Sequence, residues 1–120
     1  MNLPLASLVI PLALAGCALA GCALPAPVVL SSEADPGTFS CSVSAAEAAG
    51  YVVEDVETGV FFRAAQGRMD GLVPKRDVLT VTVTSGRLRV VADGEGGAPT
   101  RRAREEAEAV VSRCGVSSAA

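Results

Sequence analysis

Four cysteines carry the most distinctive chemistry that this sequence offers. Cys17 and Cys22 stand near the N-terminus, whereas Cys41 and Cys114 lie in the rest of the chain. The sequence contains no histidine, so it cannot form a Ser-His-Asp or Cys-His catalytic unit, or a zinc site that needs imidazole ligands. Lipid attachment, disulfide formation and thiol redox chemistry remain open to these cysteines.

The first two cysteines each end a copy of the same four residues. Residues 14–17 and 19–22 both read Leu-Ala-Gly-Cys, and they follow an uncharged, mostly apolar run that begins at Leu3. Both copies resemble the lipobox of bacterial lipoproteins, in which small residues precede a cysteine that becomes the lipidated N-terminus. The resemblance implies a lipoprotein signal peptide at residues 1–21 and a thioether-linked lipid on Cys22.

Cys17 is the alternative lipidation site. Cleavage before Cys17 leaves an extra thiol at Cys22, whereas cleavage before Cys22 discards Cys17, which suits an oxidising compartment better. Two other interpretations of residues 1–21 stay open: a simple secretory signal and an uncleaved membrane anchor, although prolines and the lack of flanking positive charge disfavour the anchor. The residues after the two cysteines, Ala18 and Ala23, are not acidic. By resemblance to lipoprotein sorting in enteric bacteria, this favours the outer membrane.

The composition of the chain changes at Glu33, its first charged residue. Residues 22–38 are rich in proline, serine and alanine, which predicts a lipidated N-terminus followed by a flexible tether. Residues 39–114 mix charged and apolar side chains and predict one small folded domain. Residues 115–120 follow the last predicted helix and predict a disordered tail.

The pattern within this domain predicts an α+β fold with the order α-β-β-β-β-α. Ser44 and Glu47 match a capping box for a short helix that stops at Gly50, and Thr100 begins a second helix that runs to about Arg113. Four strands are expected at residues 51–56, 60–65, 78–84 and 88–92, with a loop at 67–76 and a tight turn at Ser85-Gly86. We expect a small four-stranded antiparallel sheet with both helices on one face.

The two remaining cysteines stand at the outer ends of the predicted helices. Cys41 lies just before the first helix and Cys114 at the end of the last, so antiparallel helices on one sheet face would bring them together. In an exported protein this pair predicts a structural disulfide that staples a thin core. A redox or metal pair is the alternative, but it lacks a Cys-x-x-Cys spacing, and no metal site or cofactor is expected.

Arg101 and Arg102, at the start of the last predicted helix, are candidate contacts for an anion. They follow a glycine-rich stretch at residues 94–97, but the phosphate-loop fingerprint is incomplete there. The alternative is a solvated basic face that is balanced by the nearby acidic residues Glu105, Glu106 and Glu108.

Composition narrows the classes of function. A net charge of −3 and scarce aromatic residues exclude a nucleic-acid binder. Carboxylates could form a catalytic acid pair, but acidic residues at strand ends and turns are more often solvated; the candidates are Glu54, Asp55, Glu57, Asp70, Asp77 and Asp93.

These observations predict a non-catalytic binding or structural module of the cell envelope. A lipid anchor would hold it on a membrane, with the domain in the periplasm or outside the cell and with another envelope protein as its partner. A small envelope hydrolase that uses carboxylates is the alternative.

Overall fold

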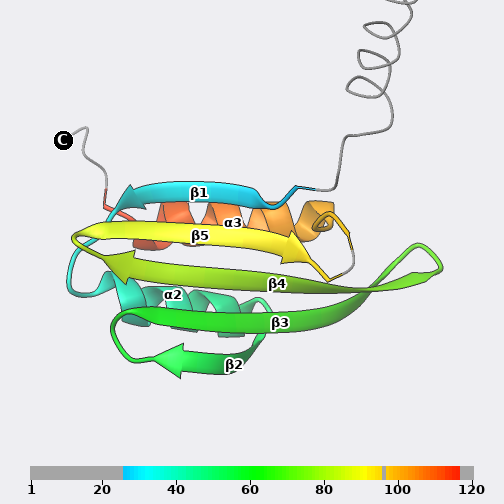
Figure 1. The fold of residues 1–120 in the computed structure, drawn as a ribbon, viewed down its shortest axis with the longest axis horizontal. Coiled ribbons are helices and arrows are strands. Elements are labelled where there is room, and N and C mark those ends of the chain that lie inside the picture. The colour runs from blue at the N-terminus through cyan, green and yellow to red at the C-terminus, as the bar shows by residue number, and fades with distance from the viewer. Residues whose placement is uncertain (1–25, 96, 117–120) are drawn as a thin grey trace, which may run out of the picture.

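The computed structural model describes residues 26–95 and 97–116, which form a five-stranded antiparallel sheet with two helices on one face (Figure 1). The elements are β1 (Val28–Glu33), α2 (Thr38–Ala48), β2 (Val52–Glu57), β3 (Phe61–Asp70), β4 (Val73–Thr84), β5 (Arg87–Gly94) and α3 (Arg101–Cys114). The strand order is β1-β5-β4-β3-β2. The α+β class is confirmed, but the predicted number of strands is wrong, because the sheet has five.

The additional strand, β1, lies in the segment that we predicted to be a tether. It pairs with β5 along its whole length, with Val28 opposite Ala92 and Glu33 opposite Arg87. The described prolines of this segment, Pro27 and Pro36, lie outside the strand, where they interrupt no ladder hydrogen bond. Because the partner strand is far away in the sequence, nothing in the local pattern marks residues 28–33 as part of the sheet.

The first helix begins earlier than predicted. Ser44 lies inside α2, so the expected capping box with Glu47 is wrong; α2 begins at Thr38, and its N-cap is Gly37. Asp35 fixes the turn before the helix: its Oδ1 accepts a hydrogen bond from the Gly37 amide at 2.8 Å, and its own amide donates to Thr38 Oγ1 at 2.9 Å. The helix therefore gains more than a full turn at its N-terminus.

Gly50 ends α2 as predicted. Its φ of +96° is a conformation that glycine adopts without strain. The amide of Gly50 donates to the carbonyl of Glu47, and the amide of Tyr51 donates to that of Ala46, both at 3.0 Å. These two bonds satisfy carbonyls of the last helical turn, and the chain passes directly into β2.

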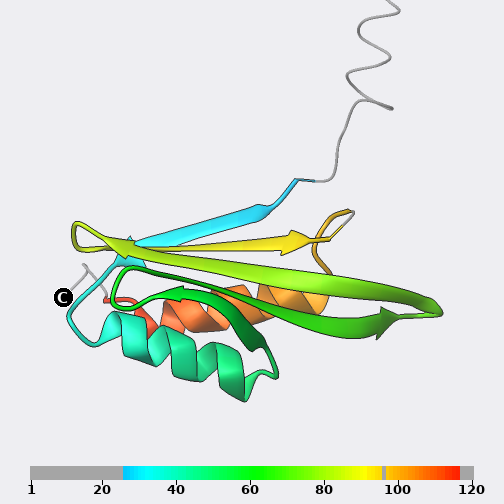
Figure 2. The ribbon, with the colours of Figure 1, turned by 60° about the horizontal axis from the view of Figure 1, so that its bottom comes forward.

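The predicted loop at residues 67–76 is wrong, because β3 and β4 continue through it as a long hairpin. No further strand pairs with either of them there: β2 pairs with β3 only as far as Ala65, and β5 pairs with β4 only from Asp77, although the Glu95 amide donates to the Arg76 carbonyl at 2.8 Å. Pro74 is tolerated in this two-stranded part because no third strand needs its amide. The hairpin projects beyond the rest of the sheet (Figures 1 and 2).

The turn between β4 and β5 is the two-residue turn that we predicted. Ser85 and Gly86 have φ values of 52° and 73°. Positive φ at both central positions is the signature of the type I′ turn, whose twist suits a tight antiparallel hairpin.

The core lies between the sheet and the helices. Its largest fully buried side chains are Phe62, Leu79, Leu88, Val81 and Val90. From α2, the ring of Phe39 meets Phe62 edge-on at 5.8 Å between centroids. From α3, Ala103, Ala107 and Val110 are buried, which confirms the predicted apolar stripe. No helix in the described part of the chain is long and apolar enough to cross a membrane.

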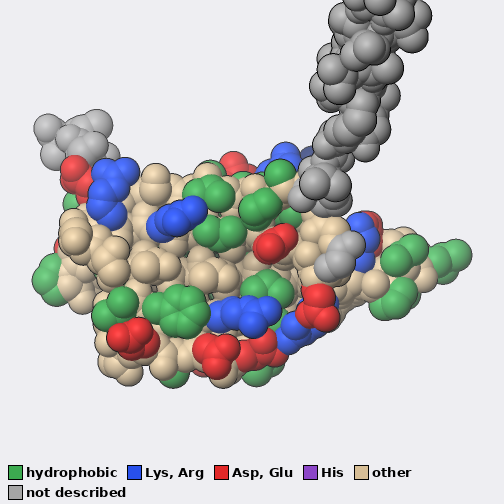
Figure 3. Space-filling view, viewed as in Figure 1, with side chains coloured by type: hydrophobic (Ala, Val, Ile, Leu, Met, Phe, Trp, Pro, Cys, Tyr) green, Lys and Arg blue, Asp and Glu red, His purple; other side chains and the backbone are tan. Residues whose placement is uncertain are grey.

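Among the described residues, no helix covers the other face of the sheet, and Figure 3 shows charged and hydrophobic side chains mixed across it. One row of paired residues crosses four strands of this face: Val29, Val91, Thr80 and Arg63. The face is therefore mixed in character and has no continuous apolar surface along this row.

Candidate functional site

The predicted lipidation residues Cys17 and Cys22 lie outside the described residues, as do residues 117–120 of the predicted tail. The first residues of that tail are ordered against β1: the Val116 amide donates to the Glu33 carbonyl at 2.8 Å, and Ser32 Oγ donates to the Val116 carbonyl at 3.2 Å. The chain is thus held in place just past the end of α3.

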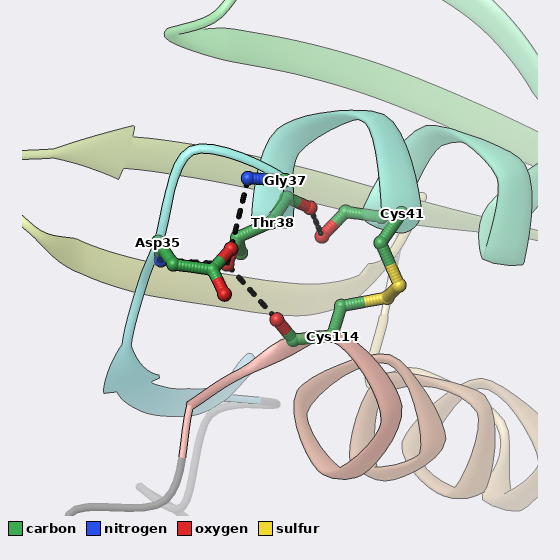
Figure 4. Close-up of a disulfide and its surroundings, with 6 residues drawn as sticks. Asp35, Gly37, Thr38, Cys41 and Cys114 are labelled. Carbon is green, nitrogen blue, oxygen red and sulfur yellow. Dashed lines mark hydrogen bonds between the residues drawn. A yellow bond between two sulfur atoms is a disulfide. The ribbon is translucent and has the colours of Figure 1, made fainter.

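The predicted disulfide between Cys41 and Cys114 is confirmed (Figure 4). The two Cα atoms lie 5.5 Å apart, and the bond links the first turn of α2 to the last residue of α3. Beside it, the buried Thr38 hydroxyl donates to the Cys114 carbonyl at 3.0 Å. The bond and the hydrogen bond together fix the C-terminal end of α3 against α2.

A buried polar cluster fixes the opposite end of α3, and sequence reasoning missed it. We define the cluster as Tyr51, Arg68, Asp77, Thr100 and Glu106. Asp77 is fully buried. Its Oδ1 accepts from the Thr100 amide at 3.0 Å, and its Oδ2 accepts from the Thr100 hydroxyl at 2.6 Å.

Thr100 is the N-cap of α3, as predicted, because its Oγ1 accepts from the Ala103 amide at 3.2 Å. Asp77 therefore holds the residue that starts the helix. The same carboxylate has a charged neighbour, since Arg68 Nε lies 3.0 Å from Asp77 Oδ2, although the N–H direction does not make this ion pair a hydrogen bond. Both oxygens of Asp77 are thus engaged in structural contacts.

Arg68 joins the cluster to the second carboxylate. Its Nη2 donates to Glu106 Oε1 at 2.8 Å, and its guanidinium lies 5.7 Å from the centre of the Tyr51 ring. The Tyr51 hydroxyl also donates to Glu106 Oε1, at 2.8 Å. Burial, followed by the hydrogen bond to Glu106, raises the pKa of Tyr51. The cluster therefore links α3 to β3 and to the start of β2 through groups with little access to water.

One signal in the sequence could have revealed this cluster. Asp77 has the same strand parity as Leu79 and Val81, and Arg68 has the same parity as Phe62 and Ala64. Continuing the two-residue alternation by one step from Leu79, and by two steps from Ala64, places both charges on the core face. The expectation that Asp77 is solvated is wrong for this reason.

The other candidate carboxylates do not meet at one place. Arg76 follows the opposite parity from Asp77 along β4, and it forms ion pairs with Glu54 and Glu95. These two hydrogen bonds, with Glu95 first, raise the pKa of Arg76. Asp70 lies 3.2 Å from Lys75. The three others are exposed at separate positions: Asp55, Glu57 and Asp93.

Arg101 and Arg102, the candidate anion contacts, are both exposed. The side chain of Arg101 is 92% exposed, and its Nε lies 3.2 Å from Glu105 Oε1, one turn further along α3. This arrangement is the one expected from the solvated-face alternative.

A shallow groove of about 240 Å³ lies between α2 and α3, beside the polar cluster. Alanines form most of its wall, and Glu106 and Arg113 are its charged residues. Because Glu106 already accepts hydrogen bonds from Tyr51 and Arg68, the groove offers few polar groups that converge on a ligand. Within residues 26–95 and 97–116, no three His, Cys, Asp or Glu side chains are grouped to hold a metal ion.

In comparisons with known proteins, no family model and no curated protein matches this chain. An interpretation of its function therefore depends on its own residues, namely the doubled N-terminal motif and the contacts described above.

Proposed function

We propose that this chain is an exported bacterial lipoprotein, held on a membrane by a lipidated Cys22. Its α+β domain would then be a non-catalytic binding or structural module of the cell envelope. The observation that carries the proposal is the disulfide between Cys41 and Cys114. Such bonds persist in oxidising compartments and are rare where thioredoxin and glutathione keep thiols reduced.

The cysteine pattern supports this proposal as a whole. If the chain is cleaved before Cys22, then Cys17 leaves with the signal peptide and Cys22 carries the lipid. The other two cysteines are joined to each other. Every thiol of the mature protein would then be used, which suits a protein that resides outside the cytoplasm.

The carboxylates support a non-catalytic role. Asp77 uses both oxygens to hold Thr100, while Glu54 and Asp70 face the cations Arg76 and Lys75. A hydrolase would need an acid and a base that converge on one cleft, and these three carboxylates have separate partners. The hydrolase alternative therefore has no specific support.

An edge strand is the feature that best fits a protein partner. β2 is a poor template for strand addition, because its register shifts between Val53 and Asp55 and it carries three acidic residues. Among the described residues, the outer edge of β1 is bridged only at Glu33, by Val116. An extended segment of an envelope protein could add to residues 28–32 by main-chain hydrogen bonds.

The deciding measurement is the intact mass of the protein extracted from membranes of its native host, with and without reduction. We expect residues 22–120 plus acyl groups, and a gain of about 2 Da on reduction as the disulfide opens. Cys22→Ser is the test variant and Cys17→Ser its matched control. Only Cys22→Ser should lose the acylated species of residues 22–120. An uncleaved, unacylated chain with free thiols would overturn the proposal.

A further inference from the structure

The tip of the β3–β4 hairpin exposes apolar side chains that the fold does not use. Leu72 is 95% exposed, and its neighbours Met69 and Val73 are 63% and 56% exposed. Figure 3 shows hydrophobic side chains on this projecting end of the molecule. Three large apolar side chains that are exposed together at the end of a two-stranded projection gain nothing from contact with water, and such patches mark interaction surfaces.

The hairpin is held on both of its faces where it leaves the sheet. On the inner face, Arg68 of β3 contacts Asp77 and Glu106 in the polar cluster. On the outer face, Arg76 of β4 is paired with Glu54 and Glu95. These contacts come from β2, from α3, from β4 itself and from the residue after β5, so they direct the hairpin outward from its base.

The chain enters the domain at the same end of the sheet. Val28, the first residue of β1, lies opposite Ala92 of β5, which in turn lies opposite Leu79 of β4. From Leu79, β4 runs back to the tip at Leu72, a projection of about 23 Å at ~3.3 Å per strand residue. The hairpin tip and the entry of the N-terminal segment therefore lie toward the same end of the molecule (Figures 1 and 2).

The length of chain before β1 limits how far the domain can stand from an anchoring lipid. Cys22 precedes Val28 by six residues, and a fully extended chain of that length spans at most about 20 Å. This reach is similar to the projection of the hairpin beyond the level of Val28. A lipid on Cys22 therefore brings the bilayer surface within reach of the tip.

We propose that the hairpin tip, formed by Met69, Leu72 and Val73, is a second membrane contact that inserts into the lipid interface beside the N-terminal anchor. The proposal rests on lipidation at Cys22. The chemistry at the tip suits an interface: Asp70 and Lys75 pair with each other beside the apolar residues, so neither charge opposes insertion alone. The contact would also fix the orientation of the domain, with the turn at Ser85 pointing away from the bilayer.

The absence of tryptophan from the chain gives a clean test. Leu72→Trp places a single fluorophore at the tip, and the exposed Thr84→Trp places one at the far end of β4 as a matched control. The lipidated, full mature variants are incorporated into phosphatidylethanolamine and phosphatidylglycerol vesicles that contain brominated acyl chains. We expect the emission of Leu72→Trp to shift to the blue and to lose roughly half of its intensity or more, because bromine quenches only an indole that reaches the acyl chains. The emission of Thr84→Trp should not change.

The acyl mass of each sample separates the two proposals. If the mass shows acylation at Cys22 and the indole of Leu72→Trp still emits as it does in water, the membrane contact is overturned and the lipoprotein proposal stands. An unacylated chain overturns both. A blue shift that occurs in native envelopes but not in pure lipid vesicles also overturns the lipid contact, because it assigns the tip to a protein partner. Met69→Trp, on the other arm of the tip, should repeat the result for Leu72→Trp.

Discussion

The two ends of α3 are attached to the domain by different chemistry. At its C-terminal end, Cys114 is covalently bound to Cys41 of α2. At its N-terminal end, Thr100 is held by the buried carboxylate of Asp77, which also faces Arg68. The first attachment depends on redox conditions and the second on charge, so each can be removed while the other stays.

The two attachments also act on different states of the chain. A disulfide constrains the unfolded ensemble and stabilises the fold mainly by lowering the entropy of that ensemble. Asp77 acts only in the folded state, where its hydrogen bonds offset the cost of burying its charge. The disulfide therefore acts through the unfolded state and Asp77 through the folded state.

Removal of the disulfide is the largest expected effect. Cys41→Ala combined with Cys114→Ala opens a loop with a sequence separation of 73 residues. On the chain-entropy model the free energy of unfolding should fall by about 4 kcal/mol, as measured by urea denaturation. Reduction of the unmodified protein should give a similar loss. A loss below about 1 kcal/mol in both experiments would mean that the bond constrains little of the unfolded chain.

Asp77→Asn should lower the free energy of unfolding by about 3 kcal/mol, because it leaves Arg68 buried without one of its two counter-charges. Glu106 keeps the loss below that of a fully orphaned charge, since it still accepts from Arg68 Nη2. The matched background is the Arg68→Met protein. If the charge pair between Arg68 and Asp77 causes the loss of stability, Asp77→Asn should lower the free energy of unfolding much less in that background. An equal fall in both backgrounds would mean that Asp77 stabilises the fold only through its hydrogen bonds to Thr100. Urea denaturation of the four proteins of this cycle measures the difference.

The features that the sequence predicted are those with local causes. Gly50, the Ser85-Gly86 turn and the Thr100 cap each depend on the conformation or side chain of the residue itself. The pairing of Cys41 with Cys114 followed from the expected placement of antiparallel helices on one face of the sheet. The local preferences of these residues are kept in the folded structure because they agree with the sheet and helix packing around them.

The features that were missed depend on distant partners. β1 is a strand because β5 provides its ladder, and the hairpin continues past residue 67 because two strand segments pair with each other where the rest of the sheet has ended. The polar cluster is not evident either, since Arg68, Asp77 and Glu106 come from three elements. A local pattern states the preference of one segment and does not identify the segment that will complete its hydrogen bonds.

Thr100→Ala tests the link between Asp77 and α3 with a smaller change. It removes the Thr100 hydroxyl, which accepts from the Ala103 amide as the N-cap and donates to Asp77. We therefore expect the free energy of unfolding to fall by about 1.5 kcal/mol. Thr100→Ser keeps the hydroxyl and should stay within about 0.5 kcal/mol of the unmodified protein. Urea denaturation under oxidising conditions, with the disulfide intact, isolates this end of α3. Equal losses for both variants would show that the methyl group matters more than the hydroxyl.

Tyr51→Phe is expected to have the smallest effect at neutral pH, a fall of about 1 kcal/mol in the free energy of unfolding. It deletes the two part-buried hydrogen bonds of the Tyr51 hydroxyl, which donates to Glu106 and accepts a longer bond from Arg68. Its signature lies at alkaline pH. Burial and Glu106 raise the pKa of Tyr51 in the folded state above the value of about 10 that it has when unfolded. The folded state therefore holds this proton more tightly, and the resulting stability is complete below about pH 10 and is lost as the pH rises toward the folded pKa.

Tyr51 is the only tyrosine of the chain and there is no tryptophan, so near-ultraviolet absorbance follows its ionisation alone. We expect native Tyr51 to ionise only as the domain unfolds. The free energies of unfolding of the unmodified and Tyr51→Phe proteins should converge as the pH rises above about 10. Ionisation near pH 10 in a still folded domain would mean that the Tyr51 hydroxyl is open to water. The polar cluster would then not hold its end of α3 through groups that are shielded from water.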